Sequence, residues 1–310
     1  MLKKVIKLFK NPKLAVLYGL DIRIFKILPD DIFLKIKYKL HIGKKLNLTT
    51  PQTFNEKLQW LKLYDRNPIY TQLVDKYEVR KYISKTIGED YLIPLIGVWD
   101  KFEDIDFSKL PNQFVLKPNH TSGNIFICKD KSNIDYVKLK KEVNMWLKRR
   151  YYWVHREWPY KNVKPRIICE KYMVDESGVE LKDYKIFCFS GEPKIIQVDY
   201  NRFTSHKRNL YDTEWNYINA SIKYPTDPNI KIKKPEKLNI MLDLARVLAK
   251  DYPHVRIDFY SIKDKVYFGE MTFYHGAGFE TFNPEDFQIQ MGEWIKLPYN
   301  LKINNKRGAL

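Results

Sequence analysis

The sequence has few cysteines and no apolar run long enough to cross a bilayer. Only three cysteines occur among its 310 residues, and none belongs to a CxxC pair. A disulfide framework and a zinc site are therefore not expected, and we expect buried thiols in a reducing compartment. A transmembrane helix needs roughly 18 apolar residues, and no run reaches that length. The N-terminus also lacks the pattern of a signal peptide, which predicts a cytoplasmic protein.

Several catalytic and binding motifs are missing as well. The sequence has no Walker loop, and none of its six histidines lies in a nucleophile-elbow context. Aromatic residues are interleaved with basic ones at 151–158 (Tyr151, Tyr152, Trp153, Trp158). No RNP, KH, zinc-finger or helix-turn-helix pattern accompanies them, so a nucleic-acid partner is not expected.

Positive charge is abundant: the formal net charge is +18, which favours an anionic partner. Near the N-terminus, lysines flank a helical face formed by Leu2, Val5, Ile6 and Phe9. Such a basic amphipathic segment predicts contact with a membrane surface or a partner. An ordinary surface helix packed on the domain is the alternative.

Hydrophobic periodicity predicts an α+β protein with hairpins rather than an alternating βαβ fold. Thr53 and Glu56 have the spacing of a capping box at the start of the first predicted helix. The predicted helices cover residues 54–66, 72–83, 136–152 and 236–250, and the predicted strands cover 92–99, 113–117, 125–128, 166–173, 183–189, 194–200, 254–260 and 265–273. We divide the chain into a basic, mainly helical region (1–90), a small lobe (91–175) and a large lobe (176–310).

The last predicted hairpin carries two carboxylates. In HVRIDFY and VYFGEMTF, the turn near Lys263 allows a register that places Asp258 opposite Glu270. Opposed Cβ atoms lie about 4.5–5.5 Å apart, so the two charges repel unless a cation lies between them. Magnesium is commonly held by one or two carboxylates and substrate phosphates. The alternative is neutralisation by a basic side chain, with Arg256 the obvious candidate.

A second segment, FVLKPNHTSGN at 114–124, places a lysine at the end of a strand before a turn of small residues. Lys117 would supply a point charge to a phosphate, and Ser122, Gly123 and their neighbours would supply backbone N–H groups. A plain β-turn with an exposed lysine is the alternative.

Two further strands carry isolated polar residues. RIICEKYMV places Glu170 before Tyr172 and Met173, where backbone groups could receive a base edge, although a core strand with one polar residue is the simpler explanation. DYKIFCF alternates Asp183 and Lys185 with apolar residues, which predicts the wall of a cleft. The following segment, VDYNRFTSHKRN, contains Asp199, Arg202 and Arg208 and could grip a carboxylate or phosphate; a charged loop without a ligand is the alternative.

In this order, the segments resemble the TupA-like ATP-grasp family, which is found with bacterial capsule and teichuronopeptide biosynthesis. The resemblance covers roughly residues 50–300 and rests on TFNEKLQWLKLYDRNP, VDKYEVRKYI, FVLKPNHTSG, ICEKYM, DYKIFCFSG, VRIDFY and GEMTFYHGAG. It implies an ATP-grasp fold, in which two α+β lobes hold ATP between them.

The resemblance also implies roles for single residues. Lys117 would contact ATP phosphate, and Lys76 would be a further nucleotide or structural lysine. Arg256, Lys185 and Arg202 would be catalytic cations. Asp258, Glu270 and Thr272 would bind Mg²⁺; Thr272 stands where many ATP-grasp enzymes carry asparagine, which favours one ion over two. The remaining nucleotide-binding residues would be His120, Thr121, Ser122 and Gly123 in the phosphate loop, Glu170, Lys171, Tyr172 and Met173 in the adenine hinge, and Asp183 with Lys185 beside the ribose and phosphates.

The family context implies an ADP-forming ligase that uses ATP and Mg²⁺ to join a carboxylate to an amine. The expected partners are an acidic sugar or glycan and an amine or amino acid, with peripheral contact at the inner membrane face through the basic N-terminus. A glycosyltransferase of capsule assembly, a sugar kinase on the same fold and a non-catalytic glycan-binding or membrane-binding module are the alternatives.

Overall fold

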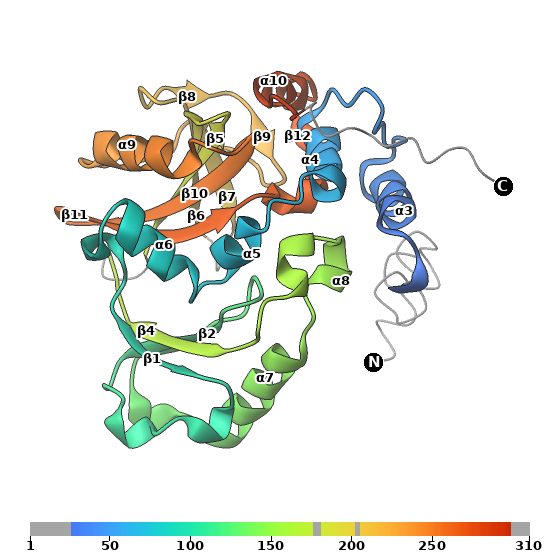
Figure 1. Ribbon diagram of the computed structural model, residues 1–310. Helices are drawn as coiled ribbons and strands as arrows, with labels where there is room; N and C mark the ends of the chain where they lie inside the picture. Colours follow the sequence, from blue (N-terminus) through green and yellow to red (C-terminus); the bar gives the residue numbers. More distant parts are fainter. Residues whose placement is uncertain (1–25, 176–180, 202–204, 299–310) are drawn as a thin grey trace.

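The computed structural model describes residues 26–175, 181–201 and 205–298. Two antiparallel sheets, each covered by helices, form two lobes that lie one above the other in Figure 1. This arrangement confirms the predicted α+β class. In spatial order, the small sheet consists of β1 (Leu95–Trp99), β4 (Ile167–Lys171), β2 (Phe114–Pro118) and β3 (Phe126–Cys128). The large sheet consists, in the same way, of β11 (Lys265–Thr272), β10 (His254–Ile262), β5 (Asp183–Phe189), β6 (Glu192–Tyr200), β7 (Lys207–Tyr211) and β8 (Tyr217–Ile218).

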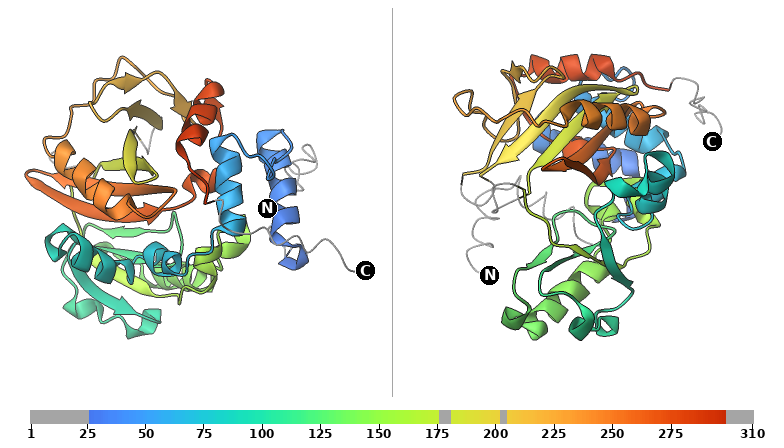
Figure 2. Two further views of the ribbon diagram at one scale, coloured as in Figure 1. Left: turned by 45° about the horizontal axis from the view of Figure 1, so that its top comes forward. Right: turned by 90° about the vertical axis from the view of Figure 1, so that its left-hand side faces the viewer.

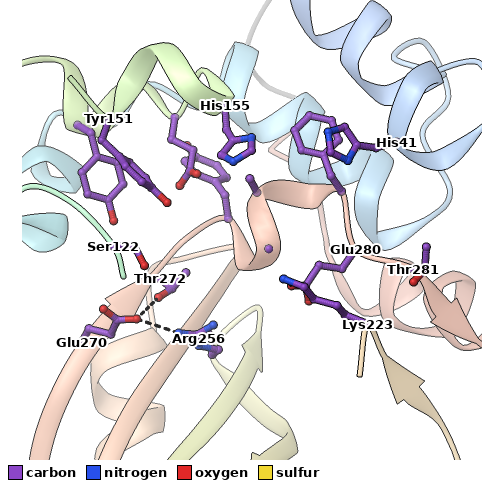
Figure 3. Close-up of a pocket in the computed structure, with 16 residues that line it drawn as sticks. His41, Ser122, Tyr151, His155, Lys223, Arg256, Glu270, Thr272, Glu280 and Thr281 are labelled. Atoms are coloured by element: carbon purple, nitrogen blue, oxygen red, sulfur yellow. Dashed lines mark hydrogen bonds and ion pairs between the residues drawn. The ribbon is translucent and has the colours of Figure 1, made fainter. Parts of the chain in front are cut away.

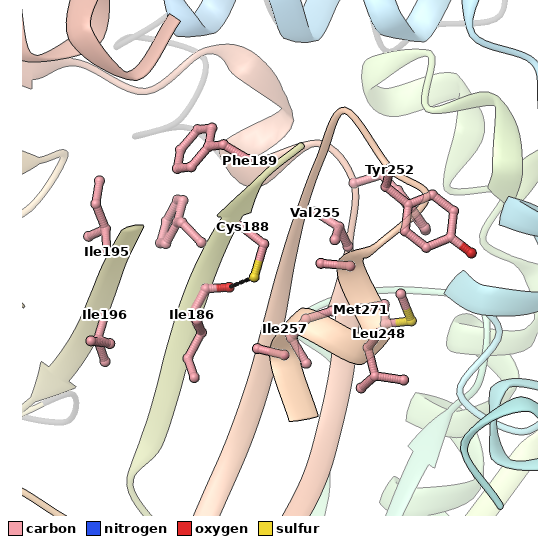
Figure 4. Packing of buried hydrophobic residues seen from close by; sticks show 14 of the residues in the cluster. Ile186, Cys188, Phe189, Ile195, Ile196, Leu248, Tyr252, Val255, Ile257 and Met271 are labelled. Atoms are coloured by element: carbon pink, nitrogen blue, oxygen red, sulfur yellow. Dashed lines mark hydrogen bonds between the residues drawn. The ribbon is translucent and has the colours of Figure 1, made fainter. Parts of the chain in front are cut away.

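One face of the large sheet is apolar and is covered by helix α9 (Leu238–Ala249). Side chains alternate between the two faces of a strand, so Ile186 and Cys188 of β5 point toward the helix together with Val255 and Ile257 of β10. Figure 4 shows these side chains packed around Leu248 of α9. The polar residues between them must therefore face the opposite side, toward the small lobe.

The small lobe has a separate core. Helix α7 (Tyr136–Lys148) packs against β2 and buries Leu139 and Val143 against Phe114 and Leu116. Its first turn is capped by Asp135, whose side chain accepts a hydrogen bond from the backbone N–H of Lys138. Short 3₁₀ turns complete this lobe at Phe102–Asp104, Phe107–Lys109 and Lys131–Asn133.

The helices that precede the small lobe pack mainly on the large one. Helix α4 (Phe54–Tyr64) begins at the predicted capping box, in which Thr53 and Glu56 bond reciprocally. Its Phe54 and Leu58 belong to the same core as the six-stranded sheet. Helix α3 (Asp30–Ile42) forms a smaller cluster with Ala277 and Phe279. Residues 30–86 therefore share the cores of the rest of the molecule.

The single helix predicted over 72–83 is wrong. The chain forms two short helices instead, α5 (Ile69–Val74) and α6 (Val79–Thr86). They are separated because the Asp75 carboxylate accepts hydrogen bonds from the backbone N–H groups of Tyr77 and Glu78, at 2.8 and 3.2 Å. Such local bonds compete with a continuous helix. The break leaves Lys76 between the two helices, beside the junction of the lobes.

The remaining elements connect or flank the lobes, as two further views show (Figure 2). The flanking elements are α8 (Tyr152–His155), α10 (Asp286–Trp294), the paired strands β9 (Ser221–Ile222) and β12 (Phe282–Asn283), and 3₁₀ turns at Glu89–Tyr91, Trp158–Lys161 and His275–Gly278.

Three predictions about the chain as a whole can be compared with the structure. Among the described residues, no helix is both long and apolar enough to cross a bilayer. All three cysteines are buried and free, as predicted. The predicted amphipathic face at residues 2–9 lies outside the described residues.

Candidate active site between the lobes

A polar row crosses the face of the large sheet that looks toward the small lobe. Asp258 of β10 pairs with Glu270 of β11 on one side and with Lys185 of β5 on the other. Lys185 in turn pairs with Gln197 of β6. The predicted register of Asp258 opposite Glu270 is therefore confirmed, and the row continues over four strands. The pleat places Asp258, Lys185 and Gln197 on one face, and a register irregularity between Asp258 and Phe259 brings Glu270 opposite Asp258.

Arg256 holds the two opposed carboxylates together. Its Nε and NH2 atoms donate to the two oxygens of Asp258 at 2.6 and 2.7 Å, and NH2 also donates to Glu270 Oε1 at 2.9 Å. A bidentate guanidinium–carboxylate pair of this kind is short and strongly oriented. The alternative left open by the sequence, neutralisation by Arg256, is thus the arrangement that the structure contains.

The two carboxyl groups differ in their surroundings. Asp258 is buried, and burial raises its pKa although Arg256 and Lys185 act in the opposite direction. Glu270 retains a third of its side-chain exposure. Burial alone would raise its pKa, but the positive charges of Lys76 and Arg256 outweigh that effect and hold the pKa below its usual value. Glu270 is therefore the more accessible carboxylate of the pair, and its surroundings favour the ionised form.

Lysines of the junction connect this pair to the small lobe. Lys76 Nζ lies 3.7 Å from Glu270 Oε2 and donates to the carbonyl oxygen of Thr121 at 2.8 Å. On the small sheet, Lys117 of β2 lies 2.6 Å from Glu170 of β4. The neighbouring strands of the small sheet thus bring together two residues that the sequence assigns to one nucleotide site.

The predicted phosphate loop divides into an inner and an outer part. The ring of His120 is buried, with Nδ1 3.2 Å from Asn119 Oδ1 and Nε2 3.1 Å from the carbonyl oxygen of Arg149. Burial lowers the pKa of His120 to about 4, so the ring is neutral at pH 7. Ser122 and Gly123 are exposed, and Gly123 has φ of +80°. The outer part of the loop is therefore free to meet a ligand, whereas the His120 side chain is occupied inside the protein.

The predicted adenine hinge lies where β4 ends and the chain crosses toward the large lobe. The backbone N–H of Lys171 donates to the carbonyl oxygen of Pro94 at 3.0 Å, and Tyr172 and Met173 are half-buried. Asp183, predicted beside the phosphates, lies 2.5 Å from Lys185 Nζ. Arg202, predicted to be catalytic, lies outside the described residues.

The polar face also contains a network that sequence patterns did not reveal. Arg256 NH1 donates to His275 Nδ1 at 2.7 Å; since guanidinium cannot accept, the imidazole proton is on Nε2. That nitrogen lies 2.9 Å from Glu280 Oε2, and Glu280 lies 3.4 Å from Arg208 NH1. Arg208 Nε donates to Asp199 at 2.7 Å, and Asp199 lies 3.9 Å from Lys185. With Lys185 3.5 Å from Asp258 Oδ2, the ion pairs close into a ring.

A cavity of about 530 Å³ adjoins this network. Figure 3 shows Ser122, Tyr151 and Glu270 at one end, and His41, Lys223 and Glu280 at the other. The cavity therefore begins at the predicted phosphate loop and metal carboxylates and extends to helix α3. Its wall also includes Glu157, Tyr160, Arg256, Thr272, Tyr274 and Phe279.

Glu157 and the tyrosines of this wall were not among the predicted site residues. Glu157, Tyr151 and Tyr160 come from the segment YYWVHREWPY, in which aromatic and basic residues dominate the pattern. One signal was present, because a single acid stands among the aromatic residues directly after His155 and Arg156. Its position beside the site depends on a cavity shared with a strand more than a hundred residues further along, which no local pattern contains.

The sequence holds one Asp-x-Asp pattern, at Asp104 and Asp106, of the type by which a metal-dependent glycosyltransferase can be recognised. Both residues are exposed on the far side of the small lobe. Asp106 accepts hydrogen bonds from the backbone and hydroxyl of Ser108, at 3.1 and 2.6 Å, so it caps a short turn. The pattern has a structural role here and adds nothing to the cavity.

The two lobes, the hairpin carboxylates and the strand lysine together define an ATP-grasp protein. A family model described as TupA-like ATPgrasp matches residues 56–296. The chain belongs to this family. The match spans both sheets, the Asp258/Glu270 hairpin and the cavity wall, and it confirms the resemblance and the fold that the sequence predicted. No curated protein sequence matches the chain.

The comparison with solved structures finds two D-alanine–D-alanine ligases and a biotin carboxylase domain among its matches. D-alanine–D-alanine ligase from Bacillus anthracis is 19% identical, with 65% of this chain and 57% of that one covered and a TM-score of 0.39. The corresponding ligase from Helicobacter pylori is 14% identical, with 79% and 69% covered and a TM-score of 0.42. The biotin carboxylase domain of the Hydrogenobacter thermophilus 2-oxoglutarate carboxylase is 14% identical, with 74% and 47% covered and a TM-score of 0.40. The chain spans little more than half the length of the Bacillus ligase.

Proposed function

We propose that this protein is an ATP- and Mg²⁺-dependent ligase that joins a carboxylate to an amine and releases ADP. The observation that carries the proposal is the meeting of Lys76, Lys117, Arg256, Asp258 and Glu270 between the lobes, beside a cavity large enough for an acceptor. Family membership supports the same reaction class. ATP would lie between the lobes, with its phosphates toward the cavity.

The hairpin carboxylates fit a magnesium ion. Asp258 Oδ2 and Glu270 Oε1 both accept from one nitrogen of Arg256, so their oxygens converge on a single point where a cation already lies. Carboxylate oxygens are hard donors, and Mg²⁺ completes its shell with water and phosphate oxygens. The Thr272 hydroxyl, 3.2 Å from Glu270 Oε1, orients that carboxylate and is the third proposed ligand. When bound, the ion would offset negative charge on the phosphates.

The protein's own groups would position and neutralise the reacting phosphoryl group. Lys117 approaches from the small lobe, Lys76 from the junction of the lobes, and Arg256 and Lys185 from the large sheet. Phosphoryl transfer to the substrate carboxylate gives an acyl phosphate, and attack by the amine then forms the amide. Because the reaction is achieved by positioning and electrostatics, no protein nucleophile is required.

We propose an acidic sugar, such as a uronic acid of a bacterial surface polysaccharide, as the carboxylate substrate. The aromatic walls of the cavity suit a sugar ring, and the net charge of +18 favours an anionic acceptor. Contact with the inner membrane face, where such polymers are assembled, is proposed for the basic N-terminal segment.

The test is an ADP-release assay with Mg²⁺, ATP, glucuronate or galacturonate, and a panel of amines. We expect turnover only when nucleotide, sugar acid and amine are all present. The variant Glu270→Gln, which keeps the shape of an accessible side chain, should lower the rate by at least roughly 100-fold. Asp264→Asn in the hairpin turn is the matched control and should leave the rate unchanged.

Binding is measured separately by thermal shift with Mg²⁺–ATP, since a ligand that prefers the folded state raises the melting temperature. Absence of a Mg²⁺–ATP shift in the wild type, together with full activity in Glu270→Gln, would refute the proposed site. Turnover of a UDP-sugar without ATP would instead identify a glycosyltransferase, and ADP release without any amine would identify a kinase.

A further inference from the structure

We propose that Glu157 is the residue that receives the amine substrate in its ammonium form and removes the proton that makes it nucleophilic. This proposal rests on the proposed ligase function and assigns the amine to one wall of the cavity. It begins from an unusual observation: Glu157 is buried, with 5% of its surface exposed, and it lines the cavity.

The Glu157 carboxylate has no partner among the residues that the structure describes. No hydrogen bond to its side chain and no basic nitrogen within ion-pair distance is found in those ranges, although buried carboxylates are normally paired. Lys62 of helix α4, the positive charge with the largest effect on the pKa of Glu157, makes its hydrogen bonds elsewhere. Its three N–H groups have three acceptors: Gln59 Oε1 at 3.1 Å and the carbonyl oxygens of His155 and Ala277 at 3.1 and 2.7 Å. The free acceptors of Glu157 therefore face the cavity.

The surroundings of Glu157 suit an ammonium group. Tyr151 and Tyr160 line the same cavity and contact each other edge to face, with ring centroids 4.8 Å apart. Tyr274 and Phe279 contribute two more aromatic side chains to the wall. Aromatic faces with one carboxylate form a favourable environment for an organic cation. A sugar acid, in contrast, would find its cationic partner at Arg256.

Burial and the neighbouring charges act in different directions on the pKa of Glu157. Burial raises the pKa of Glu157 above its usual value; Lys62 of α4 and Lys37 of α3 act to lower the pKa, and Glu270 of β11 acts to raise it. A carboxylate with a raised pKa is a stronger base than an ordinary one and accepts a proton more readily. Glu157 and Glu270 line the same cavity, so the amine wall adjoins the proposed metal carboxylate.

The ammonium group transfers one proton to a Glu157 carboxylate oxygen, and the freed lone pair on nitrogen forms the C–N bond to the acyl phosphate carbon. The C–O bond to the phosphate breaks and its electron pair leaves with the phosphate. The phosphate also takes the second proton that nitrogen loses as the amide forms. Primary amines are mostly protonated at pH 7, so without a base only a small fraction of the amine could attack.

The experiment compares two nucleophiles in the variant Glu157→Gln, which preserves size and removes the base. Hydroxylamine is mostly neutral at pH 7 and converts an acyl phosphate into a hydroxamate without help from a base. We expect hydroxamate formation from glucuronate, Mg²⁺ and ATP to stay within about threefold of wild type, while amide formation with the active primary amine falls by at least roughly 100-fold. The loss should shrink as the pH rises and free amine accumulates.

A matched control is Glu192→Gln, an exposed carboxylate of β6 paired with Arg246 at 3.2 Å, which should change neither rate. Equal loss of hydroxamate and amide in Glu157→Gln would mean that the residue only supports the fold, and unchanged amide formation would mean that it has no role; either result overturns the proposal. Failure of the wild type to form hydroxamate from any sugar acid would instead overturn the ligase function itself.

Discussion

Arg256 is the residue that connects most of the site. It bonds two carboxylates and an imidazole with different nitrogens of one rigid plane. Lysine carries the same charge but has no such fork. We therefore expect its exact shape, beyond its charge, to stabilise the large lobe as well as to serve the reaction.

The variant Arg256→Lys should lower the free energy of unfolding by roughly 2–4 kcal/mol, because at least two charge-assisted hydrogen bonds in a buried network are lost. Urea denaturation measures the change. Arg246→Lys is the control: Arg246 is an exposed residue of α9 that pairs with Asp243 at 2.7 Å, and its replacement should cost less than about 0.5 kcal/mol. Equal effects of the two replacements would contradict the importance of the fork.

His254 makes stability depend on pH. Its Nδ1 bonds the carbonyl oxygen of Cys188 at 2.9 Å, and its ring lies against Phe54 and Phe189. Burial lowers the pKa of His254 to about 3, below the usual 6.5. Above pH 6.5 neither the folded nor the unfolded chain binds the proton. Below it only the unfolded chain does, so stability falls as pH decreases from 6.5 toward 3.

The variant His254→Gln, which can still donate to Cys188, should flatten this part of the stability curve. Urea midpoints measured between pH 7 and pH 4 give the comparison. A variant that loses stability with acidification as steeply as the wild type would show that other groups, such as His120 and His275, carry the whole effect.

Among the elements, the final hairpin was predictable in part. The sequence allowed a register with Asp258 opposite Glu270, but regular pairing outward from the turn would place Gly269 there. The structure reaches the predicted pair through a register irregularity between Asp258 and Phe259, which alternation alone does not reveal. The capping box at Thr53 was fully predictable, since both partners lie within one turn.

The helix predicted around Asp75 was not found as one continuous element. Its apolar spacing is helical, but the Asp75 side chain bonds two backbone N–H groups and Asn119 Nδ2 at 2.9 Å. The last contact comes from a different lobe. Propensity and periodicity describe one segment at a time, so a break imposed partly by a distant residue was not visible.

Helix α10 provides a prediction at this scale. It packs on α4 at Gly292, where an added Cβ would collide with the backbone carbonyl oxygen of Gln52. Gly292→Ala should therefore destabilise the protein by roughly 1–3 kcal/mol through overpacking, despite the better helix propensity of alanine. Chemical denaturation of Gly292→Ala is compared with Gln290→Ala, an exposed position on the same helix. A gain in stability for Gly292→Ala would show that the contact can relax.

At the scale of the whole molecule, the cavity is assembled from parts that are far apart in the chain. Helix α3, the segment around Glu157, the loop at Ser122 and the hairpin at Glu270 each supply a side. No sequence period relates them; their meeting depends on how the lobes pack. The residues assigned to the nucleotide lie in ordered sequence motifs, whereas most of the cavity wall lies in no motif that the sequence made visible.

Lys76 joins the two sides of this assembly, because it contacts both the phosphate loop and Glu270. Lys76→Met keeps the length of the side chain and removes its charge. The thermal shift caused by Mg²⁺–ATP should then fall to less than half of the wild-type value, since the loop loses its tie to the large lobe. Lys81→Met on the exposed side of α6 should leave the shift intact. If Mg²⁺–ATP raises the melting temperature of Lys76→Met as much as that of the wild type, the contact of Lys76 with the loop does not contribute to nucleotide binding.

The closed ring of ion pairs and hydrogen bonds bears on the order in which substrates bind. Asp258 and Glu270 would hold the metal ion of a bound nucleotide with carboxylate oxygens that now accept from Arg256. Arg256 would be left with unsatisfied N–H groups at the edge of the cavity, ready for a second anion. We therefore expect compulsory-order kinetics, with nucleotide first and sugar acid second, and a dead-end sugar analogue should be an uncompetitive inhibitor with respect to ATP.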